Sequence, residues 1–248
     1  MLSFDVTRAL PTIPPELVVV DEAEPCPYLN DRIARRPLRI PIRPLSPEEL
    51  DVRLEQGDRR SGPFLYNQEC SACAACEPLR IDVPRFTPSR SQSRAARVGD
   101  RTLLVELGEP IVDDERVALF GKHELQRNLR QRDHALDALE YSRFLIETNA
   151  PGFEIRYRLK ETGKLIGIAI TDRGANSLSA VYTFYDPDYA RLSPGVYSIL
   201  TQTRLCQRWN LQWLYLGLAI EESPRMRYKL GFHPHERRIG GVWTRFER

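Results

Sequence analysis

The sequence has little lysine, no long apolar run and none of the features of an exported protein. Only four of its 36 basic residues are lysine, and all the others are arginine. No segment approaches the roughly 18 consecutive apolar residues that span a membrane. The N-terminus has no basic segment that leads into an apolar run, so no secretory signal is predicted. These absences predict a cytoplasmic protein without a membrane anchor.

Disulfide chemistry is also excluded by the cysteine pattern. Cys70, Cys73 and Cys76 repeat at a spacing of three, and only Cys26 and Cys206 lie elsewhere. Such a cluster suits a reducing compartment and a soft metal better than a disulfide framework. Zinc and iron–sulfur clusters both take four ligands, so Cys26 is the predicted fourth. Spacing alone does not separate zinc, an iron–sulfur cluster and simple packing of buried thiols, whereas Cys206 is expected in a core.

Composition is that of an ordinary globular protein. The 248 residues are 42% hydrophobic and 28% charged, and they suffice for one large domain or two small ones. The formal net charge is only +2, so bulk charge does not indicate nucleic acid as a partner. The preference for arginine favours phosphate and carboxylate contacts, because the planar guanidinium binds both in a bidentate fashion.

The first 108 residues are predicted to form a small cysteine-bearing domain. Ser46, Pro47 and Glu49 carry the signals of a capped helix start, and Gly57 is a plausible end. Residues 1–25 read as open chain with one short apolar run, and strands are expected at 79–86 and 101–107. The polar segment 88–94 reads as a solvated linker, or alternatively as a phosphate-binding segment.

Residues 109–248 are predicted to form a second domain that mixes helices and strands. Helical periodicity covers 113–148, and strands are expected at 153–159, 165–171, 178–185, 211–216 and 242–246. Helices are expected from Val196 and over 224–230. This order is compatible with the mixed sheet of a GNAT-type acyltransferase, within an α+β fold. Ser193 and Gly195 precede the helix at Val196, where free backbone N–H groups would form an anion site.

Several segments resemble a known family, the bacterial aminoacyl-tRNA–protein transferases of the N-end rule pathway. In the first half these segments are Cys26-Pro27-Tyr28-Leu29, Arg59-Arg60-Ser61-Gly62, Phe64-Leu65-Tyr66, the cysteine cluster to Pro78, and Pro88-Ser89-Arg90-Ser91-Gln92. In the second half they are Tyr182-x-Phe184-Tyr185-Asp186-Pro187-Asp188, Tyr197-Ser198-Ile199-Leu200, Tyr215-Leu216-Gly217 and Met226-x-Tyr228-Lys229. The chain departs from the family pattern at Pro194 and at Leu218-Ala219.

The resemblance implies transfer of an amino acid from a charged tRNA to proteins that begin with Asp or Glu. Leucyl-tRNA is the donor in the bacterial branch, and arginyl-tRNA is the alternative. The donor ester is already activated and the acceptor amine has a pKa near 8, so no cofactor is needed and positioning supplies much of the rate. The departures from the pattern fall where the donor should lie.

Candidate site residues follow from this reaction. The expected catalytic residues are Tyr182, Tyr185, Asp186 and Asp188, with an aspartate holding the incoming ammonium and a tyrosine donating to the ester. The expected substrate-binding residues are Arg59, Arg60, Arg80, Arg90, Ser193, Gly195 and Lys229, with the arginines meeting the acidic side chain.

Two further functions stay open at this point. One is a CoA-dependent N-acetyltransferase with a metal-binding appendage, although the glycine-poor segment 193–195 makes a poor pyrophosphate loop. The other is a metal-dependent regulator that binds nucleic acid through the cysteine domain. The mixed sheet predicted for the second half counts against that regulator.

Overall fold

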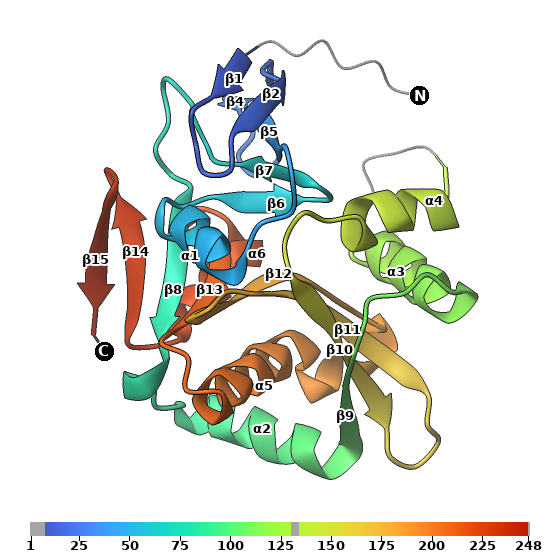
Figure 1. Cartoon of the computed structure of the whole chain (residues 1–248). Coiled ribbons are helices and arrows are strands. Elements are labelled where there is room, and N and C mark those ends of the chain that lie inside the picture. Colours follow the sequence, from blue (N-terminus) through green and yellow to red (C-terminus); the bar gives the residue numbers. More distant parts are fainter. Residues whose placement is uncertain (1–7, 130–133, 248) are drawn as a thin grey trace.

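The computed structural model describes residues 8–129 and 134–247 (Figure 1). Its first part contains β1 (Arg8–Leu10), β2 (Glu16–Val20), β3 (Ala23–Pro25), β4 (Ile33–Arg35), β5 (Leu38–Pro41), α1 (Pro47–Glu55), β6 (Arg59–Ser61) and β7 (Phe64–Tyr66). The middle part contains β8 (Glu77–Asp82), the 3-10 helix η1 (Val83–Arg85), α2 (Arg90–Thr102), β9 (Leu103–Gly108), α3 (Asp114–Gln126), α4 (Ala138–Tyr141) and the short π-helix η2 (Ser142–Ile146). The last part contains β10 (Gly152–Leu159), β11 (Leu165–Arg173), β12 (Ser177–Tyr185), η3 (Pro187–Leu192), α5 (Pro194–Arg208), β13 (Trp213–Ala219), α6 (Pro224–Arg227), η4 (Tyr228–Gly231), β14 (His235–Ile239) and β15 (Val242–Phe246).

The centre of the molecule is a mixed eight-stranded sheet. Its strand order is β15-β14-β8-β13-β12-β11-β10-β9, and every neighbouring pair is antiparallel except β12 and β13. Those two strands are parallel, so the chain must cross over between them, and α5 makes that crossover. An α+β fold with an acyltransferase-type mixed sheet is thus confirmed.

β12 and β13 pair only at one end. Ser177 to Ser179 face Trp213 to Tyr215, and no pairing between the two strands follows. A bulge at Val181 interrupts β12 against β11, and another beside Gly217 interrupts β13 against β8. Bulges increase local twist and bend a strand, so they account for the separation of the two strands. Backbone groups along the inner edge of the gap therefore lack a strand partner.

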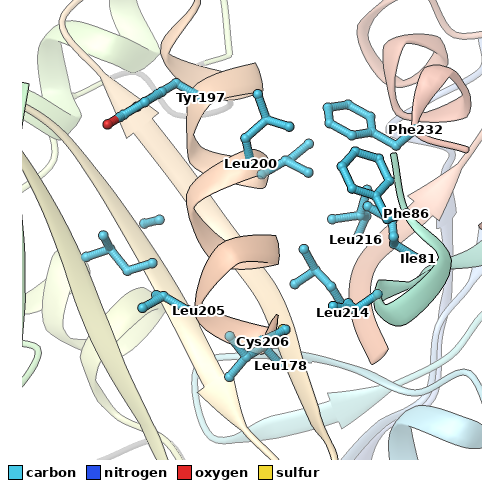
Figure 2. Close-up of a cluster of buried hydrophobic side chains, with 14 of the residues drawn as sticks. Ile81, Phe86, Leu178, Tyr197, Leu200, Leu205, Cys206, Leu214, Leu216 and Phe232 are labelled. Atoms are coloured by element: carbon cyan, nitrogen blue, oxygen red, sulfur yellow. The ribbon is translucent and has the colours of Figure 1, made fainter. Parts of the chain in front are cut away.

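Helices cover both faces of this sheet. α5 packs on β12 and β13, and α2 lies along the outer side of α5 at the bottom of Figure 1. Leu200 and Leu205 of α5 meet Leu214 and Leu216 of β13 in the largest apolar cluster (Figure 2). α3 covers β11 and β12 on the opposite face, where Phe120 is fully buried. Cys206 is buried in the α5 cluster, as expected.

The N-terminal residues form a second sheet instead of the open chain expected over 1–25. Its order is β1-β2-β5-β7-β6, and β3 and β4 form a separate hairpin. One face of this sheet packs against α1. The start of α1 has the predicted capping box between Ser46 and Glu49. The larger sheet includes β8 and β9, which both come from residues 1–108. A boundary at residue 108 therefore does not follow the edge of either sheet.

The segment 88–94 is not a linker. Ser89 caps α2, and Gln92 completes a capping box, so the polar residues begin a helix of 13 residues. Gln92, Ala96 and Gly99 form its buried face. The expected strand at 79–86 is displaced to β8, and the segment that follows is the turn η1. β14, which begins at His235, was not predicted.

Candidate functional site

The turn η4 lies at the end of the gap where β12 and β13 have separated. We call this end the mouth of the gap. Lys229 of η4 donates from Nζ to the carbonyl oxygens of Leu216 and Leu218, at 2.8 and 3.1 Å. Both carbonyls belong to the part of β13 that has left β12. A neutral lysine amine has two N–H donors and one lone pair, so these two bonds use both donors and leave the lone pair free.

Arg59 of β6 lies directly beside this lysine. Gly217 adopts a φ of +74°, and a Cβ built on it would lie 2.9 Å from Nε of Arg59. The guanidinium also donates to the hydroxyl of Tyr28 and lies 5.8 Å from the ring centre of Tyr66. Its Nη1 atom is buried without a hydrogen-bond partner among the described residues. An unpartnered buried guanidinium N–H is costly, so it indicates a place for an acceptor group of a ligand.

The two cations have different protonation behaviour. Burial, together with the nearby charge of Arg59, lowers the pKa of Lys229 from 10.5 to about 7. Arg59 keeps its proton at any physiological pH. The mouth therefore holds one permanent cation and one amine that changes its charge near neutral pH, which is the range in which a general base works best.

An aromatic and cationic group borders the other side of the gap. The hydroxyl of Tyr185, at the end of β12, accepts from Arg127 at 2.6 Å. Tyr228 of η4 lies near Arg127 and Tyr185, and burial raises the pKa of the Tyr228 hydroxyl. His123 of α3 bonds to the backbone of Tyr185, and burial lowers the pKa of that imidazole to about 4. Tyr185 is thus held at the mouth by Arg127, which the sequence did not single out, and its catalytic role stays a prediction.

Asp186 and Asp188 do not face an empty site for an ammonium. Asp186 is 2% exposed and pairs with Lys122 at 2.5 Å and with Lys164 at 2.9 Å. Asp188 is exposed and shares Lys122. Burial would raise the pKa of Asp186, but the hydrogen bonds from both lysines outweigh burial and hold that pKa below its usual value. The role predicted for these aspartates is therefore corrected: their own lysines occupy the place of the ammonium, and Asp186 is a poor base.

Tyr182 is a packing residue. It lies 5.3 Å from Phe144 and 5.6 Å from Phe120 between ring centres, within the aromatic cluster under α3. Ser193 has a left-handed φ of 54°, and its side chain makes no cap to α5, which corrects the predicted capping role. Gly195 has open space where a side chain would stand. An anion site at this helix start stays a prediction.

Two of the four predicted arginines are already bound by carboxylates of the chain. Arg60 donates from Nε to both oxygens of Asp172, and both side chains are buried. Arg80 pairs with Glu55 and Glu236. These contacts leave neither guanidinium available to a substrate carboxylate, so the prediction for Arg60 and Arg80 is wrong.

Trp213 and Trp243 enclose the same Arg80 guanidinium, with ring centres 3.8 and 4.1 Å away. Arg80 therefore serves as a packing and ion-pairing residue between strands. Arg90, in contrast to the buried Arg80, is exposed in the first turn of α2.

The four predicted metal ligands line one cavity of about 260 Å³. Burial and the neighbouring thiols of Cys26, Cys70 and Cys73 raise the pKa of Cys76 to about 12. As the side chains stand, no group of three or more His, Cys, Asp or Glu in residues 8–129 and 134–247 is arranged to hold a metal ion. Arg32 instead donates to the sulfur of Cys73 at 3.0 Å. Metal ligation stays a prediction.

Sequence reasoning missed the residues that complete this site. Tyr28, Tyr66 and Tyr228 lie inside the segments that carried the family resemblance, so that signal contained them without assigning a role. Lys122 lies on α3 and Arg127 directly follows that helix, and neither belongs to a motif. No helix in the described part of the chain is long and apolar enough to cross a membrane.

Comparison with known proteins gives one consistent result. The family model described as arginine-tRNA-protein transferase, N terminus, matches residues 24–94, and the model described as its C terminus matches residues 115–239. A protein of Vibrio cholerae named aspartate/glutamate leucyltransferase is 37% identical over 88% of this chain and 92% of its own length. A protein of Methylobacillus flagellatus with the same name is 36% identical over 88% of this chain and 87% of its own.

Among solved structures, the C-terminal domain of a putative lysylphosphatidylglycerol synthetase from Agrobacterium fabrum is similar, with a TM-score of 0.47 and 17% identity. That likeness covers 63% of this chain and 50% of the other. The two family models together span most of the chain, and the curated relatives match it over nearly their whole length. The chain therefore belongs to the arginine-tRNA–protein transferase family of aminoacyltransferases.

Proposed function

We propose that this protein transfers leucine from leucyl-tRNA to the α-amino group of proteins that begin with Asp or Glu. Family membership and the names of the curated relatives support this reaction. The observation that carries it is the unpartnered Nη1 of Arg59 beside Lys229 at the mouth of the β12–β13 gap. The reaction takes place in the cytoplasm, where charged tRNA is found, and it marks the acceptor for N-end rule degradation.

Arg59 anchors the acidic side chain of the acceptor. A carboxylate that approaches Nη1 would satisfy the buried donor and pair with a permanent positive charge. A glutamine or asparagine side chain would satisfy the donor without the charge, so it would bind more weakly. Gly217 allows the guanidinium to lie against β13, since any side chain there would displace it.

Lys229 accepts the proton of the attacking amine. Its pKa of about 7 leaves a large neutral fraction at physiological pH, and the lone pair points away from the two carbonyls that hold Nζ. An amine with a pKa near 8 is a suitable proton donor to such a base once it attacks. Positioning by Arg59 brings the amine close to this lone pair.

The reaction is the aminolysis of an ester and balances without a cofactor. The acceptor nitrogen attacks the ester carbonyl, a C–N bond forms, and its proton passes to Nζ of Lys229. The C–O bond to the terminal ribose then breaks, and the ribose hydroxyl takes that proton back from Lys229. Backbone N–H groups along the edge of β12 that has separated from β13 are suited to stabilise the oxyanion.

Leucine is the favoured donor residue because the separated part of β12 offers an apolar wall. Val181 and Tyr182 are half-buried there and pack against the same apolar cluster as Phe144 and Ile146 of η2. A leucine side chain buries apolar surface against such a wall, whereas an arginine side chain would lose hydration. Arginyl-tRNA is the alternative donor.

The cysteine cavity has a structural role in this proposal. Cys26, Cys70, Cys73 and Cys76 would hold zinc or an iron–sulfur cluster, and a bound metal would fix the loop that ends at β8. Tyr28 follows Cys26 by two residues and hydrogen-bonds to Arg59. No chemical step of the transfer passes through this site.

One assay distinguishes the candidate functions. Purified protein is incubated with a Glu-starting peptide and, in parallel reactions, with leucyl-tRNA, arginyl-tRNA or acetyl-CoA. The mass of the peptide is then measured by mass spectrometry. We expect the mass of one leucine residue from leucyl-tRNA alone. Addition of arginine from arginyl-tRNA would show that arginyl-tRNA is the donor. Acetylation would show that the protein is an acetyltransferase instead. No product in any arm would contradict enzymatic transfer.

A further inference from the structure

One face of α2 carries a row of arginines. Arg90, Arg94, Arg97 and Arg101 are spaced by four, three and four residues, so they project from the same side of the helix. All four side chains are exposed. Within residues 8–129 and 134–247, none of the four makes a hydrogen bond or an ion pair. We call these four residues the α2 stripe.

None of the four arginines of the α2 stripe has an acidic partner among the described residues, whereas two exposed arginines elsewhere do. Arg43 pairs with Glu49, and Arg204 pairs with Asp100. Asp100 is the only acidic residue of α2, and its carboxylate is directed to α5, where it also accepts from Tyr197. The stripe is therefore not neutralised by its own helix.

This arrangement destabilises the free helix. Like charges three or four residues apart in a helix repel one another and lower its stability. Arg90 stands in the first turn, where the helix dipole favours acidic residues, and no acidic residue is present there. An anion with regularly spaced charges would remove the repulsion along the whole stripe.

α2 is physically joined to the candidate site. Gln92 donates to the carbonyl of Gly231 at 3.0 Å, and Gly231 ends the turn η4 that carries Lys229. Phe86, just before α2, stacks on Phe232, just after η4, at 6.1 Å between ring centres (Figure 2). Gly99 lies against the ring of Tyr197, which fixes the helix on α5. The start of the stripe is thus held next to the mouth of the gap.

We propose that the α2 stripe binds the phosphate backbone of the donor tRNA beside its 3′ end. The stripe extends over about 16 Å, a length that covers several phosphates of one strand. Arginine suits this task because its planar fork can bind two oxygens of one phosphate. This inference depends on the proposed function, because it assigns a surface to the donor of that reaction.

The test measures tRNA binding apart from catalysis. We compare wild type, Arg94→Gln/Arg97→Gln, and the charge-matched control Arg8→Gln/Arg43→Gln, which changes two exposed arginines of the N-terminal part. The dissociation constant for uncharged tRNA is measured by fluorescence anisotropy over a range of KCl concentrations. A further variant, Arg94→Lys/Arg97→Lys, keeps the charge, and thermal unfolding followed by circular dichroism checks each fold.

We expect the α2 variant to bind at least 10-fold more weakly at moderate salt. The slope of log K against log salt should fall by about 2, since each lost phosphate contact contributes about 0.9. The lysine variant should keep the wild-type slope, and the control should keep both values. The α2 variant should melt no lower than wild type, because substitution relieves repulsion.

Equal affinity and slope for the α2 variant and wild type would overturn the proposal. An equal loss in the control would also overturn it, since binding would then depend on bulk charge. Leucyl transfer by wild type is assayed separately. Absence of that transfer would refute the proposed function, while transfer by wild type with unchanged binding by the α2 variant would refute the stripe alone.

Discussion

At the scale of single residues, the mouth of the β12–β13 gap combines two cations with different tasks. Arg59 carries a permanent charge and an unused buried donor, while Lys229 is held by two carbonyls and titrates near neutral pH. A lysine loses its charge readily on burial and an arginine does not, so the two are not interchangeable here.

Substitution of Lys229 by arginine tests its role as a base. In wild type, the rate at saturating substrates should rise with pH through about 7 as Lys229 loses its proton. Lys229→Arg stays charged, so we expect a loss of about 100-fold or more at pH 7.5 and no inflection near 7. Single-turnover rates from pH 6 to 9 provide the measurement. A variant that keeps the wild-type profile would show that another group accepts the proton.

The same lysine should make stability depend on pH. Its pKa is lower in the folded protein than the usual 10.5, so the folded state binds fewer protons between about pH 7 and that value. The free energy of unfolding contributed by this group therefore rises with pH across that window. Urea unfolding at pH 7, 8 and 9 should show this rise as a larger slope for wild type than for Lys229→Met. Identical slopes would mean that Lys229 titrates normally.

Gly217 sets the position of Arg59. Gly217→Ala would place a side chain on a residue with φ of +74° and within 2.9 Å of the Nε atom of Arg59. We expect a stability loss of about 1–2 kcal/mol from the backbone conformation. A rise of KM for the Glu-starting peptide should accompany it, with little change of KM for the tRNA. Gly163→Ala is the matched control, since its φ is +72° and nothing lies within 4 Å of the added carbon.

At the scale of elements, buried ion pairs fasten the N-terminal part to the large sheet. Arg60 of β6 binds Asp172 of β11, and both side chains are at most 4% exposed. Asp172→Asn would leave the guanidinium buried and unpaired, so we predict a loss of about 3–5 kcal/mol of stability. Denaturant unfolding measures this loss. The KM for the peptide should stay near the wild-type value in the folded fraction. A large rise of this KM would indicate that Arg60 takes part in substrate binding.

Elements with local signals were predictable from the sequence. The capping box of Ser46 and Glu49 defined α1, and the apolar alternation of 178–185 defined β12. The start of α2 has an equal capping box, yet its serines and arginines suggested a linker, because its buried face consists of Gln92, Ala96 and Gly99 instead of large apolar residues. β1 to β5 are strands of three to five residues, too short to show a clear alternation, so their sequence carried little signal.

The site was predictable only in part, for a physical reason. Arg59, Lys229 and Tyr185 were predicted and lie together, although their roles stay predictions. Arg60 and Arg80 were placed in the same group because sequence alone does not show the partner of an arginine. Their carboxylates come from residues far along the chain, Asp172 and Glu236. Likewise, nothing local showed that Lys122 and Lys164 would neutralise Asp186.

At the scale of the whole molecule, the candidate site is shared between the two halves of the chain. Arg59 comes from the N-terminal sheet, and Lys229 comes from the turn before β14. The cysteine cavity adjoins Arg59 through Tyr28, and Arg32 next to it pairs with Glu222. Under the proposed function, recognition of the acceptor would depend on how the N-terminal part is held against the large sheet.

This dependence gives a prediction for the cysteines. Anaerobically purified protein should contain zinc by elemental analysis, or iron with absorbance in the visible region. Cys70→Ser/Cys73→Ser should remove the metal, lower the melting temperature and raise KM for the peptide more than KM for the tRNA. Cys206→Ser, which alters the α5 core, is the control and should keep the metal. Wild-type protein free of zinc and iron would contradict metal ligation.

The most direct test of the account is discrimination between peptides that differ only in their first residue. Leucyl transfer is measured for peptides beginning with Glu, Gln or Lys, using wild type and Arg59→Gln. We predict that wild type prefers Glu over Gln by about 100-fold in kcat/KM, as expected for a charge-assisted contact of a few kcal/mol. Arg59→Gln should reduce that ratio below about 10-fold through loss of that charge. Equal transfer to Glu and Gln by wild type, or an unchanged ratio in the variant, would contradict the account.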